Sequence, residues 1–487
     1  MLIITNVLFL VSTFIFSGPL GSLTKYTLPS LMQTHTAVPA STPAPSSSQA
    51  SSAGTDLNDN ITDSSVIRLL VWQGAIKAWE NNPIFGTGVE TFAFAYYKYK
   101  LPAHNLTSEW DYLYNKAHNE YLNYLTTTGI FGLGTYLGFI GIFFFLTCKW
   151  FVDKSGKKDK EAYYESYAKS TPTTLIIIGL LAGYISMLIT NFFGFSVVII
   201  NLYIFLSPAF AFILLGLLNK EKQFTFPKSQ AQEKTQKSEI SVNPYQGSVI
   251  TIFIVIACWM IISLIWYRQA DIAYALGYNL DQIGNYQQAY PQLLQAIQME
   301  PKEPVYEDEL SINLAALAAG LYSQKDTTQG ALLAKNAIDL SNDVVTHHPN
   351  NVVYWKDRVR LFYTLSASDM TDEATYLEDA MQAINTAKAL APTDAKIAYN
   401  QGVLYGQAGN LTQAIQMLTN TVQLRSNYED AYVALGLFYH EAALDKNGNV
   451  VNQAFQQKAI TTYQYVLKNL DPNNSNVKKS LSQWQTQ

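Results

Sequence analysis

Apolar and polar residues occur in long separate blocks along this chain. Five apolar blocks, each of roughly 20 residues, cover residues 2–20, 130–151, 174–193, 197–218 and 248–267. A helix needs about 20 apolar residues to cross the ~30 Å hydrocarbon core of a bilayer. The pattern therefore predicts five membrane-spanning helices. Only residues 194–196 separate the third from the fourth, so these two are predicted to form a tight hairpin.

The distribution of lysine predicts which loops face the cytoplasm. Loops 152–173 and 219–247 each carry five lysines, and such an excess in short loops marks the cytoplasmic side. Alternation through five spans then places loop 21–129 and the region after residue 268 outside the cytoplasm. A secretory signal peptide is the alternative for block 2–20, but this block lacks a basic amino-terminal region and a clear cleavage site, which favours a retained span. The chain is thus predicted to be a multi-pass plasma-membrane protein.

After the last apolar block the pattern changes to pairs of amphipathic helices with small residues at fixed places. Gly277 begins a series in which small residues and a final proline follow at offsets of 7, 12, 19 and 24 residues, and Gly402 begins a similar series. This is the spacing of tetratricopeptide repeats, in which small residues allow two antiparallel helices to pack closely. Four or five degenerate repeats are predicted, and they favour a surface that binds a protein partner. His347 and His348 lack a third ligand nearby, so we interpret them as solvated residues at a helix end rather than as metal ligands.

These patterns predict an all-α fold, with a polytopic helical membrane domain of about five spans followed by an α-solenoid. The segment between the first two spans begins as a linker rich in Ser, Thr and Pro, which is typical of disorder. The predicted parts are a first span in residues 1–29, the linker in 30–63, an extracytoplasmic loop with a candidate site in 64–129, membrane helices in 130–267 and extracytoplasmic repeats in 268–487.

Composition excludes some classes of function. The net charge is −5, and no basic face is present for a phosphate backbone, so nucleic acid is not an expected partner. Charged residues make up only 14% of the chain, below the ~25% that is usual in soluble domains. Cys148 and Cys258 lie far apart in apolar blocks, and we interpret them as small core residues without a disulfide.

The external loop offers two candidate cations. Asp63, or one of the two serines after it, is placed to cap a helix that ends before Pro83. Arg68 lies beside the apolar face of this helix, where it either pairs with a carboxylate or holds a phosphate group with its planar guanidinium. Lys116 is a further cation in the same loop, although eight acidic residues in loop 21–129 dilute any basic patch.

His118 is the candidate for acid–base chemistry. In KAHNEYLNYL it is predicted to share one helical face with Tyr121, Leu122 and Leu125, just before the second apolar block. A lone histidine on such a face is more often a hydrogen-bonded core residue than a catalyst. Its free pKa of ~6.5 nevertheless suits proton transfer near neutral pH, and at the bilayer surface it can meet a hydroxyl from the aqueous side. The residues alone leave both interpretations open.

Two motifs together resemble the O-antigen ligase/polymerase superfamily. The first has the spacing R-x3-W-x2-A-x7-P-x2-G-x-G, at Arg68, Trp72, Ala75, Pro83, Gly86 and Gly88. The second is AHNEYL followed by GIFGL, and the hairpin NFFGFS with appended repeats resembles a subgroup of the same proteins. The resemblance covers about residues 64–218.

This resemblance implies transfer of a glycan from an undecaprenyl-pyrophosphate carrier to an acceptor hydroxyl at the outer membrane leaflet. It implies cell-envelope polysaccharide biosynthesis without a metal or another cofactor. Carried onto this chain, His118 is the general base that activates the acceptor, and Arg68 contacts the donor pyrophosphate. Lys116 is a possible supporting cation that matches no family role.

The span count departs from the family pattern, because members usually have ten or more spans and five are predicted here. A truncated frame, or one half of a split protein, is therefore an expectation. A membrane-anchored, non-catalytic repeat scaffold for envelope assembly is the alternative function. A transporter is disfavoured, because no predicted span carries a clear intramembrane charge.

Overall fold

The fold is all-α, as predicted. The computed structural model describes residues 62–155, 160–216, 244–368 and 372–486. In these ranges it contains helices and one isolated bridge, between Leu444 and Val450, but no strand. The chain divides into two compact units, Met1–Leu69 and Leu70–Gln487. The predicted first span and most of the predicted linker lie outside the described residues.

The external segment contains two α-helices and a short 3₁₀ helix. Asp63 directly precedes helix α3 (Ser64–Asn81), and its carboxylate accepts the Ser65 backbone N–H at 2.8 Å, so the predicted cap is confirmed. The helix ends two residues before Pro83, as expected from the missing N–H of proline. Helices α4 (Phe92–Tyr99) and η2 (Pro102–Leu106) follow.

Three described helices are long and apolar enough to cross a membrane. They are Glu120–Asp153, Thr173–Phe192 and Gly247–Gln282, which lie within α5 (Glu120–Ser155), α6 (Lys160–Phe192) and α8 (Pro244–Gln282). The predicted fourth span corresponds to the apolar helix α7 (Val198–Leu214), which has 17 residues and is shorter than the other three. Helices α5, α6 and α7 share a core that includes Phe143, Tyr184 and Ile204. The chain is therefore a membrane protein with approximately the predicted number of spans.

Both cysteines are exposed, so their prediction as core residues is wrong. Cys148 lies in α5 and Cys258 in α8, each on an apolar helix surface that no other part of the described chain covers. In a membrane span such a surface faces lipid rather than a protein core, because the bilayer replaces water as the apolar solvent. An apolar sequence block alone does not distinguish these two environments.

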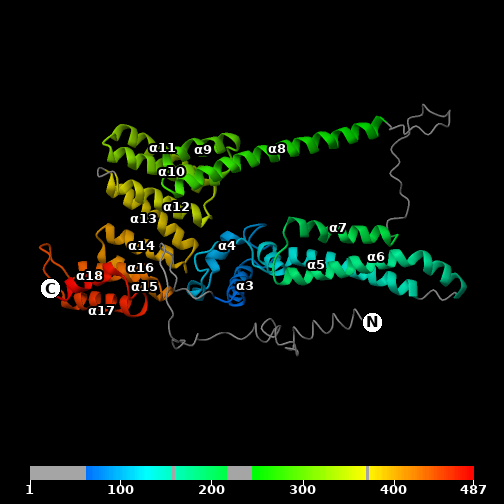
Figure 1. Cartoon of the computed structure of the whole chain (residues 1–487), viewed down its shortest axis with the longest axis horizontal. Coiled ribbons are helices and arrows are strands. Elements are labelled where there is room, and N and C mark those ends of the chain that lie inside the picture. The colour runs from blue at the N-terminus through cyan, green and yellow to red at the C-terminus, as the bar shows by residue number, and fades with distance from the viewer. Residues whose placement is uncertain (1–61, 156–159, 217–243, 369–371, 487) are drawn as a thin grey trace. The chain divides into compact units, whose positions relative to one another are not determined.

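The repeats begin on the last span without a break. Helix α8 is continuous over 39 residues, and its carboxy-terminal part buries Ala270 and Ala273 against the first repeat. Five antiparallel pairs and a final helix follow one another in chain order (Figure 1). After α8 these helices are α9 (Tyr286–Met299), α10 (Pro304–Ser323), α11 (Thr327–His347), α12 (Val352–Ser366), α13 (Glu373–Leu390), α14 (Ala395–Gln407), α15 (Leu411–Leu424), α16 (Glu429–Glu441), α17 (Gln453–Asn469) and α18 (Ser475–Trp484).

The predicted small residues lie where the paired helices approach most closely. A Cβ atom on Gly277 of α8 would lie 2.7 Å from the Leu293 side chain of α9. A Cβ atom on Gly402 of α14 would lie at the same distance from the Leu418 side chain of α15. Glycine is therefore required by the close approach of each pair. His347 and His348 are exposed at the end of α11, and no group of three His, Cys, Asp or Glu in the described residues is placed to hold a metal.

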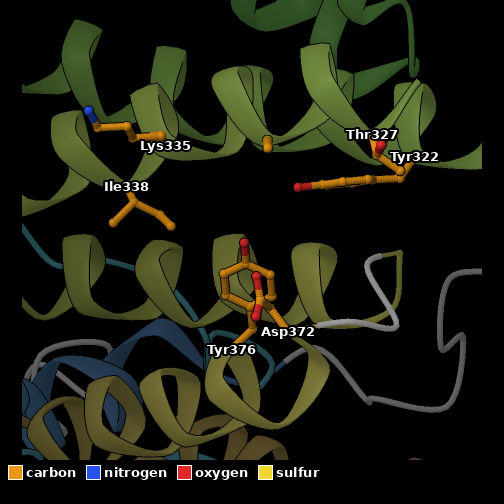
Figure 2. A pocket seen from close by; sticks show the side chains of 7 residues that line it. Tyr322, Thr327, Lys335, Ile338, Asp372 and Tyr376 are labelled. Carbon is orange, nitrogen blue, oxygen red and sulfur yellow. The ribbon is translucent and has the colours of Figure 1, made fainter. Parts of the chain in front are cut away.

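A cavity of about 400 Å³ lies among the repeats. Figure 2 shows that side chains from α10 and α11 face side chains from the start of α13 across this space. Aromatic, charged, hydroxyl and aliphatic side chains line the cavity, including Tyr322, Thr327, Lys335, Ile338, Asp372 and Tyr376.

Candidate functional site

A backbone clasp connects the external loop to the start of the membrane helix α5. We use "clasp" for the turn 82–88 together with the bend 126–131. Four backbone hydrogen bonds join its two halves, at donor–acceptor distances of 2.9 to 3.2 Å: Thr87 N to Thr126 O, Gly88 N to Thr127 O, Ile130 N to Pro83 O and Phe131 N to Ile84 O. The two sequence motifs, NPIFGTG and TTGIFG, are thus the two sides of one structural feature.

Two glycines make the clasp possible. Gly86 has φ +69° and Gly129 has φ +66°, in the left-handed region that favours glycine. A Cβ atom on Gly129 would lie 2.2 Å from the carbonyl oxygen of Ile84, and one on Gly86 would lie 2.4 Å from the carbonyl carbon of Thr127. Backbone therefore contacts backbone directly at these two positions, and Gly129 interrupts the regular helix of α5.

His118 lies in a turn just before α5, so its predicted place on a helical face is wrong. Its φ is +54°, which is uncommon for a residue other than glycine. Asn119 caps the helix instead, because its side chain accepts the backbone N–H of Leu122 at 3.0 Å. The periodicity of the apolar residues extends past the true start of the helix by two positions. The strained backbone is typical of positions at functional sites, where the surrounding structure holds it.

The imidazole of His118 is partly buried between aromatic rings. Its ring centroid lies 5.7 Å from that of Tyr114 and 5.4 Å from that of Phe195, both in edge-to-face geometry. Nδ1 lies 3.2 Å from the carbonyl oxygen of Lys116. If Nδ1 carries the proton and donates a hydrogen bond to this carbonyl, Nε2 is the unprotonated nitrogen, which is the state required of a general base.

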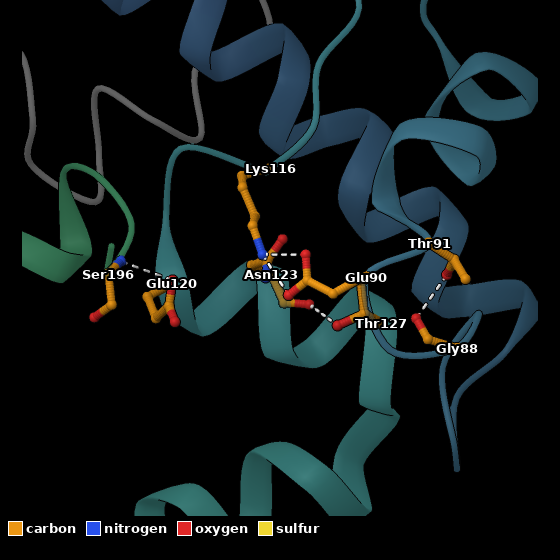
Figure 3. Close-up of polar contacts among 8 residues, drawn as sticks. All are labelled: Gly88, Glu90, Thr91, Lys116, Glu120, Asn123, Thr127 and Ser196. Carbon is orange, nitrogen blue, oxygen red and sulfur yellow. Dashed lines mark hydrogen bonds and ion pairs between the residues drawn. The ribbon is translucent and has the colours of Figure 1, made fainter. Parts of the chain in front are cut away.

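Glu120 is a buried carboxylate that the sequence analysis did not single out. It is 5% exposed, and its Oε2 accepts the backbone N–H of Ser196 at 3.1 Å in the hairpin between α6 and α7 (Figure 3). Asn191 donates to the Ser196 hydroxyl at 2.8 Å. Glu120 therefore ties the hairpin that carries Phe195 to the beginning of α5, two residues after His118.

Lys116 is paired with Glu90. Its Nζ lies 2.5 Å from the carboxylate, and the lysine side chain is 22% exposed whereas that of Glu90 is 68% exposed (Figure 3). Glu90 also has a left-handed backbone, with φ +59°. The amine of Lys116 is thus already paired with a carboxylate, which offsets its positive charge.

A second histidine, His104, contacts the Tyr114 ring that packs against His118. His104 is fully buried, and its Nδ1 lies 2.6 Å from the Tyr96 hydroxyl. Burial lowers the pKa of His104 to about 4, so this ring is neutral at pH 7. Its centroid lies 5.1 Å from that of Tyr114, which in turn contacts His118. We interpret His104 as a packing residue.

Arg68 lies on α3, four residues before Trp72. It belongs to the unit Met1–Leu69, whereas Lys116 and His118 belong to the unit Leu70–Gln487. The structure thus brings Lys116 and His118 together in one loop, and the pairing of Arg68 with His118 stays a prediction.

Comparison with protein families places a match on this part of the chain. Residues 2–137 match a family model described as O-antigen ligase. The sequence resemblance is therefore confirmed, although the matched range begins earlier than residue 64 and ends earlier than residue 218. The range contains Arg68, Lys116, His118 and both halves of the clasp.

Solved tetratricopeptide-repeat structures are similar to part of the chain. They include a tetratricopeptide-repeat protein of Thermus thermophilus (17% identity, covering 45% of this chain and 100% of that one, TM-score 0.32). MamA of Desulfovibrio magneticus has 18% identity over 42% of this chain and 98% of its own, with a TM-score of 0.30. A tetratricopeptide-repeat protein of Parabacteroides merdae has 15% identity over 45% and 73%, with a TM-score of 0.32. The comparison with curated proteins gives no significant match.

Proposed function

We propose that the chain transfers a glycan from an undecaprenyl-pyrophosphate carrier to an acceptor hydroxyl at the outer membrane leaflet, without a metal or another cofactor. One observation carries this proposal. His118, a partly buried histidine with a left-handed backbone, lies two residues before an apolar helix and inside the range that matches the O-antigen ligase model. The donor is a membrane lipid, so a reactive group at the start of a span is well placed to meet it.

His118 acts as the general base. Its Nε2 takes the proton of the acceptor hydroxyl while that oxygen attacks the anomeric carbon of the donor glycan. The bond from this carbon to the pyrophosphate oxygen breaks, and the electron pair leaves with the pyrophosphate. The Lys116 carbonyl, 3.2 Å from Nδ1, stabilises the imidazolium that forms, because it accepts a hydrogen bond from the charged ring.

Arg68 binds the departing pyrophosphate. The leaving group gains negative charge during the reaction, so a fixed guanidinium stabilises the transition state more than the ground state. Lys116 has a smaller part, because a pyrophosphate would have to compete with Glu90 for its amine. On this proposal loop 64–129 and the repeats lie outside the cytoplasm, where lipid-linked glycans are available.

A membrane-anchored scaffold is the second candidate function. It is favoured by the continuity of α8 from an apolar span into the first repeat, which fixes the repeats to the membrane by a single helix. In that case the repeats bind a protein partner of the cell envelope and the loop has only a structural part.

The test replaces His118 by Ala and measures glycan transfer from a lipid-linked donor by full-length protein in lipid vesicles. We expect transfer to fall by at least about 100-fold, the usual contribution of a general base. His348→Ala is the matched control, because His348 is exposed on the repeats. Transfer by the His118 variant at the rate of the control, with equal amounts of protein in the membrane, would favour the scaffold.

A further inference from the structure

We propose that the repeats hold the His118 turn in place by docking loop 100–114, with Asp111 as the positioning residue. The docking surface consists of the first turn of α14 with the two residues before it (Thr393 and Asp394), Lys356 of α12, and the connection between α15 and α16. This inference deepens the proposed function and rests on it for the part played by His118. It assigns to the repeats a task within the chain itself.

Two hydrogen bonds, each from a side chain to a backbone carbonyl, join the loop to the repeats. The Thr393 hydroxyl donates to the carbonyl oxygen of Lys100 at 2.7 Å, and the Asn105 amide donates to the carbonyl oxygen of Thr393 at 2.8 Å. Asn105 is fully buried, and the amine of Lys100, a residue that is 5% exposed, donates to the Trp110 carbonyl. The partners of the two bonds to Thr393 are 293 and 288 residues apart in sequence, so these two bonds form only when the repeats and the loop are in contact.

Asp111 lies between two lysines of the repeats. Its carboxylate is 2.5 Å from the Lys396 amine and 3.9 Å from that of Lys356. Lys396 stands in the first turn of α14, which is capped by the Asp394 carboxylate through the Lys396 N–H at 2.9 Å. A cation is unfavourable at a helix amino terminus, because the helix dipole is positive there. Asp111 offsets this charge, so the pair stabilises the docked loop and α14 together.

Trp110 strengthens the same contact. The guanidinium carbon of Arg425 lies 4.0 Å from the centre of the Trp110 ring, and the Tyr428 ring lies 5.3 Å from it. Arg425 is only 3% exposed, and a cation over an aromatic face is attracted more strongly when water is excluded. Neighbouring residues Trp110 and Asp111 thus contact three different parts of the repeats.

The docked loop leads directly to His118. Tyr114 follows Asp111 by three residues, its hydroxyl donates to Glu109, and its ring covers one side of the His118 ring at 5.7 Å. The same ring lies against buried His104 at 5.1 Å. Release of the loop from the repeats therefore displaces Tyr114 and opens the environment of His118.

The first measurement detects the docking without reference to activity. Full-length protein in lipid vesicles is treated with a zero-length carbodiimide, which joins a carboxylate to an amine in contact, and cross-linked peptides are identified by mass spectrometry. We expect an Asp111–Lys396 cross-link. The second measurement is the rate at which diethyl pyrocarbonate modifies His118, relative to exposed His348 in the same molecule.

Charge reversal at Asp111 then tests whether the docking contact controls the reactivity of His118. Asp111→Lys should abolish the cross-link and raise the relative rate at His118 about fivefold, the factor that corresponds to the upper range for an exposed ion pair. The double variant Asp111→Lys with Lys396→Asp should recover at least half of the change. Asp343→Lys is the matched control, since Asp343 pairs with His347 on α11, outside the docking surface.

Two results would overturn the proposal: absence of the Asp111–Lys396 cross-link in the wild type, or a His118 rate in Asp111→Lys equal to that of the control. In the transfer assay we expect kcat to fall in Asp111→Lys and to recover in the double variant, with little change in KM for the donor. If the His118 rate follows the charge pair while His118→Ala still transfers normally, the proposed function fails and the positioning stands.

Discussion

The clasp near the start of α5 and the helix pairs of the repeats both depend on glycine, but in different ways. In the clasp, Gly86 and Gly129 have a left-handed backbone and would direct a Cβ atom at backbone atoms. In the repeats, Gly277 and Gly402 lie in regular helices and would direct it at leucine side chains. A side chain can change its rotamer, whereas a hydrogen-bonded backbone cannot move away without breaking its bonds.

The difference explains why the repeat motif is degenerate. Thr421 stands where the pattern usually has alanine, and it is fully buried in α15. Its hydroxyl donates to the Met417 carbonyl at 2.9 Å, so the additional polar atom is satisfied within its own helix. Side-chain packing in the repeats accommodates such changes, and the clasp leaves no comparable freedom.

The largest effect is expected for Gly129→Ala. The substitution combines a left-handed backbone with an atom 2.2 Å from the Ile84 carbonyl oxygen, so we expect a loss of about 3–5 kcal/mol in the local stability of the clasp. Hydrogen exchange at the Thr87, Gly88 and Ile130 amides measures this opening.

Gly134→Ala is the matched control in the same helix, because a Cβ atom there meets nothing within 4 Å. Equal exchange rates in the Gly129 and Gly134 variants would show that the clasp is not held by backbone contact.

The pH dependence of the repeats comes next in size. Burial and the neighbouring carboxylates of Asp281 and Asp357 raise the pKa of Glu309 to about 7. The folded state thus favours the protonated form of Glu309. The contribution of this protonation to the free energy of unfolding is therefore fully present below pH 4.5 and is lost as the pH rises through 7. Asp308 faces the same cluster with a raised pKa, and Arg360 opposes the shift of Glu309.

Glu309→Gln should remove up to about 3 kcal/mol of this dependence between pH 4.5 and 7, because glutamine does not titrate. The measurement is hydrogen exchange in α10 at several pH values. Exposed Glu373→Gln, at the start of α13, is the control. A wild-type stability in α10 that does not change over this range would contradict the prediction.

Gly402→Ala should have a smaller effect than Gly129→Ala. The new methyl group would lie 2.7 Å from Leu418, which can shift, so we expect a loss of about 1–3 kcal/mol in the α14–α15 pair. In contrast, Gly320→Ala in α10 meets nothing within 4 Å, and alanine is the better helix former by up to about 1 kcal/mol. Thermal unfolding of the two variants should therefore shift in opposite directions, and a shared direction would refute the packing argument.

Local sequence information predicted the local features of the fold correctly. The spacing from Gly277 to Pro301 predicted the first repeat, and the Asp63 cap and Pro83 stop bounded α3 correctly. It missed contacts between distant residues: Glu120 and Ser196 are 76 residues apart, and Lys100 and Thr393 are 293 apart. It also placed His118 in a helix, because apolar periodicity carries no information on the sign of φ.

The smallest effect is expected at the ion pair between Lys116 and Glu90. Glu90 is 68% exposed, and exposed pairs contribute about 0–1 kcal/mol, so Glu90→Gln should leave the stability of the clasp almost unchanged. It removes the charge that competes with a pyrophosphate for Lys116, so on the proposed function KM for the donor should decrease a few-fold at constant kcat. Glu80→Gln, on α3, is the control. A KM that changes equally in both variants would indicate a general effect of the net charge, and would leave Lys116 without a part in donor binding.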